Sequence, residues 1–519
     1  MYPYEANSTL SDEDGDWITS HRVNRYRDWD ELRYSIRSIE KYASRFRNKI
    51  QILVNSVADP SDVLTQHATV DNPAFINRKQ KPEWLKIDAD VEVLSQEDFF
   101  GEVEKGCLPS FNSLTTENQA FNTKSDTDRV RCFTVLIIDS HVVLTSQFFA
   151  LSDDMILGKP HAASDIYSPL FGPTMGFKPK EYNVVKTPTE SDASRFGEKP
   201  FLIYTSWMLN RRFGTRRRKG QVHFGHSMSR STTKEAMGSF PRPSLQSACQ
   251  KFRGEAGFQL YSWYLTFHYT IERHREALLW SYLMLRSDID QDGNLGWGER
   301  QTILKDLREG MVHEGKTGFR KRMFYHMPES FEKAGLEAPK VNLDVLWTSL
   351  DGPVAIKDRD CYEFNVTECL APGFASMGPP HSESNFSTTA IFDHVARQHP
   401  ECGDCLIKLI LNRVKQGLAP LLPYASTQSQ QREMVIKALW KYQYTIVEPD
   451  AMFVMVTDAE QIEHKLLERL IRREEKVGQL CLNDDVETDE DGPVADVRKV
   501  MQEVLQQLLP NPSIFEEGS

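Results

Sequence analysis

The chain has 519 residues, of which 40% are hydrophobic and 26% are charged, a composition typical of globular proteins. Because one hydrophobic core rarely grows beyond about 250–300 residues, we expect two or more domains or a large insertion. The net charge of −12 disfavours a protein that binds nucleic acid through bulk positive charge.

No apolar run approaches the ~20 residues that a membrane-spanning helix requires. The nearest candidate, residues 133–151, is interrupted by Asp139, Ser140 and His141. The first residues are acidic and lack the basic and then apolar pattern of a signal peptide. From these features we expect a soluble chain.

The first third of the chain predicts alternating helices and strands. Apolar residues at helical spacing follow Asp28, and two short β-branched runs at residues 49–57 and 91–95 predict strands. Ser95 and Asp98 have the spacing of a capping box. A third strand is predicted at 148–151, and the Pro-, Gly- and Ser-rich sequence that follows, to about residue 200, predicts loops.

The middle and the end of the chain predict further elements. Residues 258–286 and 300–308 predict helices, whereas residues 311–425 give mixed signals. The C-terminal part predicts helices and strands again, at residues 430–442, within 445–456, and at 459–475, 480–482 and 495–508.

The sharpest local motif is DIDQDGNLGWGE, residues 288–299, which has the ligand spacing of an EF-hand calcium loop. Gly293 stands where the loop turns sharply, and Leu295 is its apolar residue. The predicted Ca²⁺ ligands are Asp288, Asp290, Asp292, Asn294 and Glu299. The alternative is an acidic loop that binds no ion.

Two similar acidic triplets, Ser152-Asp153-Asp154 and Asn483-Asp484-Asp485, each follow an apolar strand. Ligands of open α/β sheets bind beyond the carboxyl ends of strands. The four aspartates could therefore hold Mg²⁺ or Mn²⁺ against a diphosphate. The alternative is that they are ordinary loop residues or helix caps.

A basic segment precedes two histidines. Arg216 and Arg218 could contact phosphate oxygens, and Arg253 is a further candidate. His223 and His226 titrate near neutral pH, which suits a general base for a sugar hydroxyl. The alternatives are a solvated basic loop, a packed histidine and, for Arg253, a surface ion pair.

The eight cysteines leave the compartment open. Four of them fall in one short region, where disulfides or a zinc site would both fit: Cys361, Cys369, Cys402 and Cys405. Three N-glycosylation triplets would be modified only in a secretory lumen: those at Asn7, Asn365 and Asn385.

Several segments, in the same order, resemble the conserved blocks of the Stealth family of sugar-phosphate transferases. Residues 25–43 and 148–160 resemble the second block, residues 218–230 and 250–255 the third, and residues 480–485 and 511–516 the fourth. The family includes bacterial capsule polymerases, the lysosomal-enzyme N-acetylglucosamine-1-phosphotransferase and fungal xylosylphosphotransferases. The chain is most similar to the fungal branch.

The resemblance implies an α/β fold with a Rossmann-like catalytic core assembled from separated blocks, and a largely helical insertion carrying the EF-hand. It divides the chain into a first core part (1–275), the EF-hand (276–310), an inserted subdomain with the cysteine cluster (311–425) and a C-terminal core part (426–519). It also implies a Golgi lumen or membrane location.

The resemblance further implies a divalent metal, Mg or Mn, and a UDP-sugar donor. A hydroxyl of a glycan or glycoprotein acceptor, with mannose receiving xylose phosphate as one version, would attack the phosphorus attached to the sugar, and UMP would leave. By motif match, the catalytic residues are Asp153, Asp154, His223 with His226, Arg253, Asp484 and Asp485, and the donor contacts are Asn483, Arg216 and Arg218.

Some features depart from the family pattern. The first conserved block and the usual N-terminal membrane anchor are absent, and residues 125–145 are longer than the family's link there. A truncated or mis-spliced gene model would explain both. Two other functions therefore stay open: a metal-dependent glycosyltransferase that releases UDP, and a non-catalytic calcium-binding relative.

Overall fold

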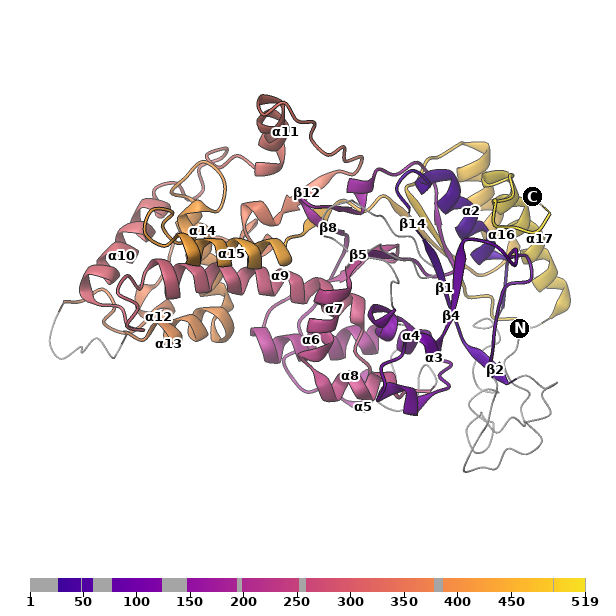
Figure 1. Cartoon of the computed structure of the whole chain (residues 1–519), viewed down its shortest axis with the longest axis horizontal. Coiled ribbons are helices and arrows are strands. Elements are labelled where there is room, and N and C mark those ends of the chain that lie inside the picture. The colour runs from indigo at the N-terminus through magenta and orange to yellow at the C-terminus, as the bar shows by residue number, and fades with distance from the viewer. Residues whose placement is uncertain are drawn as a thin grey trace.

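The computed structural model describes residues 27–47, 49–58, 77–123, 147–193, 198–251, 258–377, 386–488 and 490–518. The described chain is a mixture of helices and short sheets, as the sequence predicted at the level of an α/β class. Figure 1 shows an elongated molecule with a helical lobe at one end and a lobe of helices and strands at the other. Within the described residues, no helix combines the length and the apolar character needed to cross a membrane.

The lobe that contains the C-terminus is built around a three-stranded sheet. Strands β14 (Ala451–Val456) and β15 (Gln479–Asp484) are parallel, and β6 (Met155–Leu157) pairs antiparallel with β15. The connection from β14 to β15 is helical, as predicted, through α16 (Ala459–Ile462) and the π-helix η12 (Glu463–Arg472). Apolar side chains of this connection, of the sheet, of α2 (Glu31–Ala43) and of α17 (Asp491–Leu508) form one core.

A second parallel pair follows α2 in the chain. The two β-branched runs form strands, as predicted, and these strands, β1 (Ile50–Val54) and β4 (Val91–Ser95), pair along their whole length. The short helix α3 (Gln96–Phe99) begins with the expected capping box, in which the Ser95 N–H donates to Asp98 Oδ2 at 2.8 Å. Strands β2 (Ser56–Ala58) and β3 (Asn77–Lys79) form a small antiparallel pair.

Loops make up much of the stretch from residue 152 to about 200, as the sequence predicted, but the stretch also holds four short strands. Three of them pair with parts of the chain further along, so the local sequence does not reveal their partners. Besides β6, the strands of this stretch are β7 (Tyr167–Ser168), β8 (Gly172–Met175) and β9 (Phe177–Tyr182). Strands β12 (Val345–Thr348), β13 (Thr445–Val447), β8 and β7 make a four-stranded sheet in that order, and β9 pairs with β10 (Arg218–Gln221).

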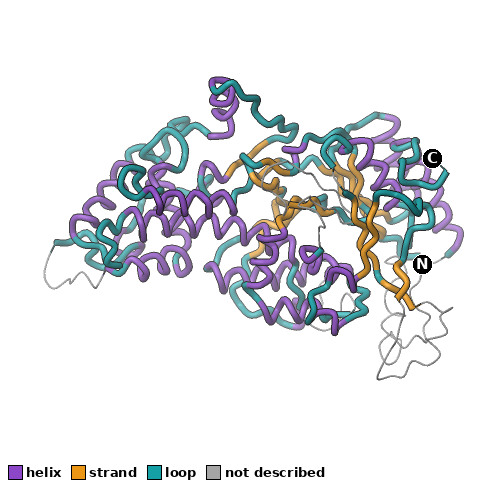
Figure 2. The backbone as a smooth tube through the Cα atoms, viewed as in Figure 1, coloured by secondary structure: helices purple, strands orange, loops and turns teal. Residues whose placement is uncertain are grey.

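Helices occupy the centre and the far lobe, as the purple segments of Figure 2 show. The predicted helix at 258–286 is α9 (Ser262–Trp280), which continues as the π-helix η6 (Ser281–Arg286). The central helices are α4 (Ser113–Gln119), α5 (Glu190–Ala193), α6 (Lys199–Phe213), α7 (Arg230–Gly238) and α8 (Pro241–Ala248). The remaining helices of the far lobe and its upper edge are α10 (Trp297–Met311), α11 (Met323–Lys333), α12 (Val366–Cys369), α13 (Thr388–Asp393), α14 (Pro400–Leu411) and α15 (Ser429–Lys441).

The structure decides the cysteine alternatives in favour of disulfides. The four clustered cysteines pair as Cys361–Cys405 and Cys369–Cys402, so they are not a zinc site. A third disulfide, Cys107–Cys249, ties the short 3₁₀-helix at Glu104–Cys107 to the end of α8. Cys481 on β15 is a free, buried thiol.

Candidate active site

The antiparallel pairing of β5 (Gln147–Ala150) with β11 (His226–Ser229) brings the acidic turn after β5 to the histidine loop before β11. His226 lies opposite Ala150, so residues before His226 and after Ala150 leave the sheet at the same end. The loop is also fixed to β15, because the Gly225 N–H donates to Gln479 Oε1 at 2.8 Å. A Cβ at residue 225 would meet the Phe149 ring at 2.3 Å, so this close approach requires glycine.

Strand register brings the two acidic triplets to the same end of the β14–β15–β6 sheet. The Leu482 N–H donates to the Asp154 carbonyl at 3.0 Å, one residue beyond the pairing of Cys481 with Met155. The turn that contains Asp153 therefore lies beside Asn483 and Asp484 at the carboxyl ends of two parallel strands. This is the edge at which α/β sheets bind ligands.

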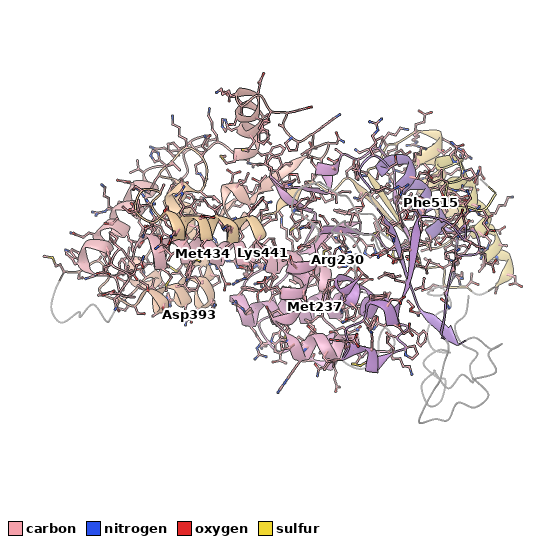
Figure 3. All side chains as sticks on the ribbon, viewed as in Figure 1. Arg230, Met237, Asp393, Met434, Lys441 and Phe515 are labelled. Atoms are coloured by element: carbon pink, nitrogen blue, oxygen red, sulfur yellow. A yellow bond between two sulfur atoms is a disulfide. The ribbon has the colours of Figure 1, made fainter. Side chains whose placement is uncertain are left out.

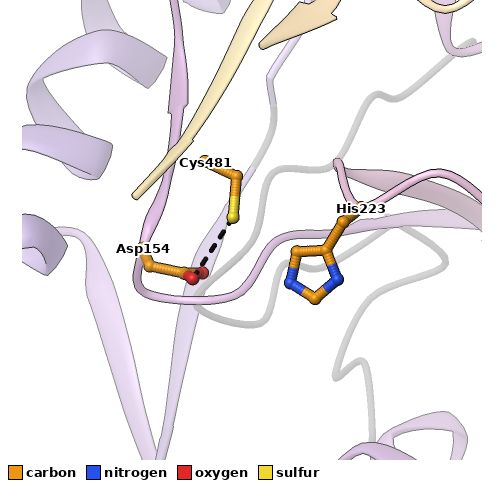
Figure 4. A group of neighbouring side chains, drawn as sticks. All are labelled: Asp154, His223 and Cys481. Atoms are coloured by element: carbon orange, nitrogen blue, oxygen red, sulfur yellow. Dashed lines mark hydrogen bonds between the residues drawn. The ribbon is translucent and has the colours of Figure 1, made fainter. Parts of the chain in front are cut away.

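Asp154, His223 and Cys481 meet at the centre of this edge (Figure 4). One potential ligand atom of each lies within 4.8 Å of the other two. The Cys481 thiol donates to Asp154 Oδ2 at 3.3 Å. Asp154 Oδ1 is buried and has no hydrogen-bond partner among the described residues. A buried carboxylate oxygen without a partner is costly, which marks a position where a ligand would be favourable.

Glu198 orients His223. Its Oε1 lies 3.1 Å from His223 Nδ1, and the Tyr261 hydroxyl donates to the same oxygen at 3.1 Å. Burial opposes a charge on His223, but the hydrogen bond that His223 donates to Glu198 and the charges of Glu198 and Asp154 prevail and raise its pKa. Nδ1 faces Glu198, so Nε2 is the ring nitrogen left for a reacting proton.

Negative charge accumulates around the turn. The side chain of Asp153 reaches solvent, but much of its surroundings is protein. Desolvation raises its pKa to about 6, and the charges of Asp154 and Asp28 raise it further. Burial and then the charge of Asp153 raise the pKa of Glu31 well above its usual range. Burial also raises the pKa of Asp154, against the opposing effect of His223. A bound cation would relieve this repulsion.

Asp484 is held by an arginine that the sequence reasoning missed. Arg27 Nη1 lies 3.4 Å from Asp484 Oδ2 and 3.1 Å from the Val486 carbonyl oxygen, to which it donates. Asp484 Oδ1 also accepts the Val486 N–H at 2.9 Å. The neighbouring Asn483 donates weakly to Met455 Sδ at 3.5 Å, and the Asp485 N–H donates to the Val456 carbonyl at 2.8 Å.

His226 lies in a different environment from His223. It is buried among aromatic rings, with centroid distances of 4.6 Å to Trp263 and 5.3 Å to Phe267. Burial, and then the charge of His223, lower its pKa to about 3. His226 is therefore a neutral side chain of the core.

Arg216 and Arg218 also lie in the interior, where we expected contacts with a donor. Arg216 Nη2 lies 2.9 Å from Asp404 Oδ2, and Arg218 Nη2 lies 3.0 Å from Glu272 Oε1. Both guanidinium groups thus bind buried carboxylates, so the expected phosphate contacts were wrong for these two residues. Arg253 lies outside the described residues.

The predicted calcium loop has an ordered turn between η6 and α10. Gly293 has a φ of +83°, and its N–H donates to Asp288 Oδ2 at 3.0 Å. Asp288, Asp290 and Asp292 each offer an oxygen within 4.8 Å of the other two, and Glu299 Oε2 accepts the Gly296 N–H at 2.9 Å.

The apolar side of this loop is anchored to the segment before α13. Leu295 is fully buried, and its N–H donates to the Phe386 carbonyl at 3.0 Å. The Thr388 N–H returns a bond of 3.0 Å to the Gly293 carbonyl. Two backbone hydrogen bonds therefore join the 288–299 loop to residues 386–388.

Sequence reasoning missed Arg27, Glu31, Glu198 and Cys481 as parts of this site. Arg27 and Glu31 fall in the segment 25–43 and Cys481 in 480–485, both of which carried the family resemblance, but no local spacing distinguished them. No sequence motif indicated Glu198, because its role depends on contact with His223, which lies in a separate loop.

Comparisons with known proteins agree with the earlier resemblance. Residues 469–519 match the family model Stealth protein CR4, conserved region 4. Two xylosylphosphotransferases of Cryptococcus neoformans, named for 3-O-α-D-mannopyranosyl-α-D-mannopyranose, are each 25% identical, covering 80% of this chain and 52% of their own length. An exopolysaccharide phosphotransferase of Streptomyces coelicolor is 28% identical over 44% of this chain and 19% of its own length.

The chain spans about half the length of the fungal relatives that it matches. Their similarity extends over 80% of this chain, whereas the family model covers residues 469–519. Residues 469–519 thus match Stealth conserved region 4, and the chain is similar to fungal xylosylphosphotransferases and to bacterial exopolysaccharide phosphotransferases.

Proposed function

We propose that this protein transfers a sugar 1-phosphate from a UDP-sugar to a hydroxyl group of a glycan or glycoprotein acceptor and releases UMP. The observation that carries the proposal is the meeting of Asp154 and His223 at the carboxyl edge of a parallel strand pair, in a chain related to sugar-phosphate transferases. Xylose phosphate and a mannose acceptor are the first combination to test, because the fungal relatives bear those names.

His223 is the proposed general base. Its Nε2 would accept the proton of the acceptor hydroxyl while that oxygen forms a bond to the phosphorus attached to the sugar. The bond between this phosphorus and the bridging oxygen of UMP would break, and UMP would leave with the electron pair. Glu198 holds the ring through Nδ1 and stabilises the imidazolium that forms. Asp153, Asp154, Asp484 and Asp485 surround the same edge.

A divalent cation, Mg²⁺ or Mn²⁺, fits this acidic edge. The supporting observations are the unpartnered oxygen of Asp154 and the repulsion among Asp28, Glu31, Asp153 and Asp154. Asp153 and Asp154 would hold it, with Asp484 and Asp485 alongside. A bound cation would neutralise charge on the diphosphate oxygens of the donor and favour departure of UMP.

The 288–299 loop is the proposed Ca²⁺ site, with Asp288, Asp290, Asp292, Asn294 and Glu299 as ligands. Its support is the complete ligand spacing, the left-handed turn at Gly293 and the backbone pairing at Leu295. The flanking helices would make it an EF-hand. A single loop of this kind within a large chain favours a structural role.

The proposed location is the lumen or membrane of the Golgi. Three disulfides are typical of an oxidising compartment, which supports a secretory setting. We also propose that the two parallel strand pairs belong to a Rossmann-like core. The helical connection between β14 and β15 supports this arrangement.

The test is nucleotide release by the purified chain, given a panel of UDP-sugars, Mn²⁺ and a mannose-containing acceptor. UMP that appears only with acceptor is the expected result. UDP would replace the proposal by ordinary glycosyl transfer, and no nucleotide from any donor would leave a calcium-binding relative as the better description. His223→Gln should abolish release, whereas His464→Gln, which changes an exposed histidine on η12, should not.

A further inference from the structure

A free cysteine lies within reach of the proposed general base, and nothing in phosphoryl transfer requires it. Cys481 is buried on β15, and its thiol contacts Asp154. Asp154, His223 and Cys481 come from three segments of the chain, the turn after β5, the loop before β11 and a strand far along the sequence. Their ligand atoms converge on one point (Figure 4).

The three side chains offer one oxygen, one nitrogen and one sulfur atom. Mg²⁺ and Ca²⁺ prefer oxygen ligands alone, whereas thiolate and imidazole ligands select Zn²⁺ and similar soft cations. Three protein ligands and an open fourth position are a common zinc arrangement. Asp154 Oδ1 is buried and unpartnered among the described residues, which leaves an acceptor available for a cation.

We propose that Asp154, His223 and Cys481 form a Zn²⁺ site that inhibits the enzyme. Zn²⁺ would take the Nε2 lone pair of His223, a carboxylate oxygen of Asp154 and the Cys481 sulfur, whose proton passes to solvent. Since the same lone pair must accept the acceptor's proton, the zinc-bound form cannot act as a base. The inhibitory part rests on the proposed transferase function, whereas the metal site does not.

Metal binding can be measured without any substrate. Chelator-treated protein in saturating Ca²⁺, which occupies the 288–299 loop, is titrated with Zn²⁺ against a chromophoric zinc indicator. We expect one tight equivalent, weakened about tenfold or more by Cys481→Ser and by His223→Gln. His399→Gln is the control, and it should keep the wild-type zinc affinity. It changes a histidine outside the proposed site whose ring lies 4.4 Å from that of His394, so it tests whether this pair binds Zn²⁺ instead. Equal affinity in wild type and both site variants would overturn the proposal.

Co²⁺ substitution guards against variants that fold poorly. Wild-type protein should show a thiolate-to-cobalt charge-transfer band in the near ultraviolet. Cys132, which lies outside the described residues, is the other cysteine without an assigned disulfide, so Cys132→Ser must keep the band. Bound Co²⁺ without such a band would refute thiolate ligation.

Zn²⁺ is then added to the nucleotide-release assay at fixed Mn²⁺, and each variant is compared with its own zinc-free rate. The zinc concentration for half inhibition should rise about tenfold or more in Cys481→Ser. An active wild type that Zn²⁺ does not inhibit would overturn the inhibitory site. Zinc binding through Cys481 in a chain that releases no nucleotide would support the metal site and count against the transferase function alone.

Discussion

At the scale of single residues, environment separates two histidines that lie three positions apart. His223 meets Glu198 and Asp154, which raise its pKa, whereas His226 packs among aromatic rings and is neutral. A general base needs an accessible lone pair and a carboxylate that stabilises its protonated form. Of these two histidines, His223 alone has both features, so it is the candidate base.

Glu198→Gln should move the acidic limb of the pH–rate profile to lower pH. The base works only when it is neutral, so activity falls as pH drops through the pKa of His223. Glu198 raises that pKa, and its removal lowers it. The plateau rate should fall by less than the roughly 10²–10⁴-fold that loss of the base costs.

The measurement is kcat/KM against pH for both proteins. Glu463→Gln, on the exposed face of η12, removes the same charge elsewhere and should leave the limb in place. A limb that does not move in Glu198→Gln would show that another group titrates.

At the scale of elements, the 288–299 loop joins η6 to α10, and its Leu295 pairs with Phe386, two residues before α13. The carboxyl groups of the loop repel one another without a cation, and burial followed by neighbouring charge raises the pKa of Asp288. A bound Ca²⁺ would therefore stabilise the loop together with the helices that it joins.

Saturating Ca²⁺ should raise the Tm, because a ligand at about 100 times its Kd stabilises the folded state by about 2.7 kcal/mol. Glu299→Gln should abolish most of this rise by removing the bidentate ligand. Glu433→Gln, an exposed change on α15, should retain it. A scanning fluorimetry series with Ca²⁺ or chelator tests this, and equal Ca²⁺-dependent rises for Glu299→Gln and wild type would contradict the assignment.

At the scale of the whole molecule, a buried ion network joins the central part to the helical lobe. Arg275 on α9 and Arg216 before β10 both bind Asp404 on α14, at 2.6 and 2.9 Å. Burial opposes ionisation of Asp404, but the charges of Arg216 and Arg275 prevail and lower its pKa. Asp404 and Arg275 are fully buried, so each of these two charges depends on its partners.

Asp404→Ala should destabilise the protein by about 3–5 kcal/mol, because it removes the carboxylate that buried Arg275 binds and leaves Arg216 with Glu272 alone. Asp393, labelled in Figure 3, provides the matched control, since it pairs with Arg397 at the surface. Asp393→Ala should cost at most about 1 kcal/mol. Urea unfolding measures the free energy of unfolding of both variants. Similar losses in the two would show that the buried network contributes no more to stability than the surface ion pair.

The carboxylate of Asp404 also predicts a pH effect of known sign. Because its pKa is lower in the folded state, its contribution is fully present above the pKa of an unfolded aspartate. The contribution is lost as pH falls through the lowered folded pKa. Between neutral and acidic pH, the free energy of unfolding should therefore fall by more in wild type than in Asp404→Ala.

The sequence by itself determined features whose residues are neighbours in the chain. The helix after Asp28, the capping box of Ser95 and Asp98, and the helix between β14 and β15 follow from spacing of three or four residues. The calcium loop could be proposed for the same reason, because its ligands lie within twelve residues. The order of the conserved segments likewise carries the resemblance to Stealth proteins, and residues 469–519 match that family's region 4.

Only the tertiary structure decided what depends on distant pairing. Cys481 meets Asp154 across 327 positions, and Glu198 reaches His223 through a loop fixed by β15. The basic segment suggested phosphate contacts, but Arg216 binds Asp404 on α14 and Arg218 binds Glu272 on α9. Local spacing fixes helices and turns, whereas strand register and packing choose which charges meet, and these come from contacts that no short segment contains.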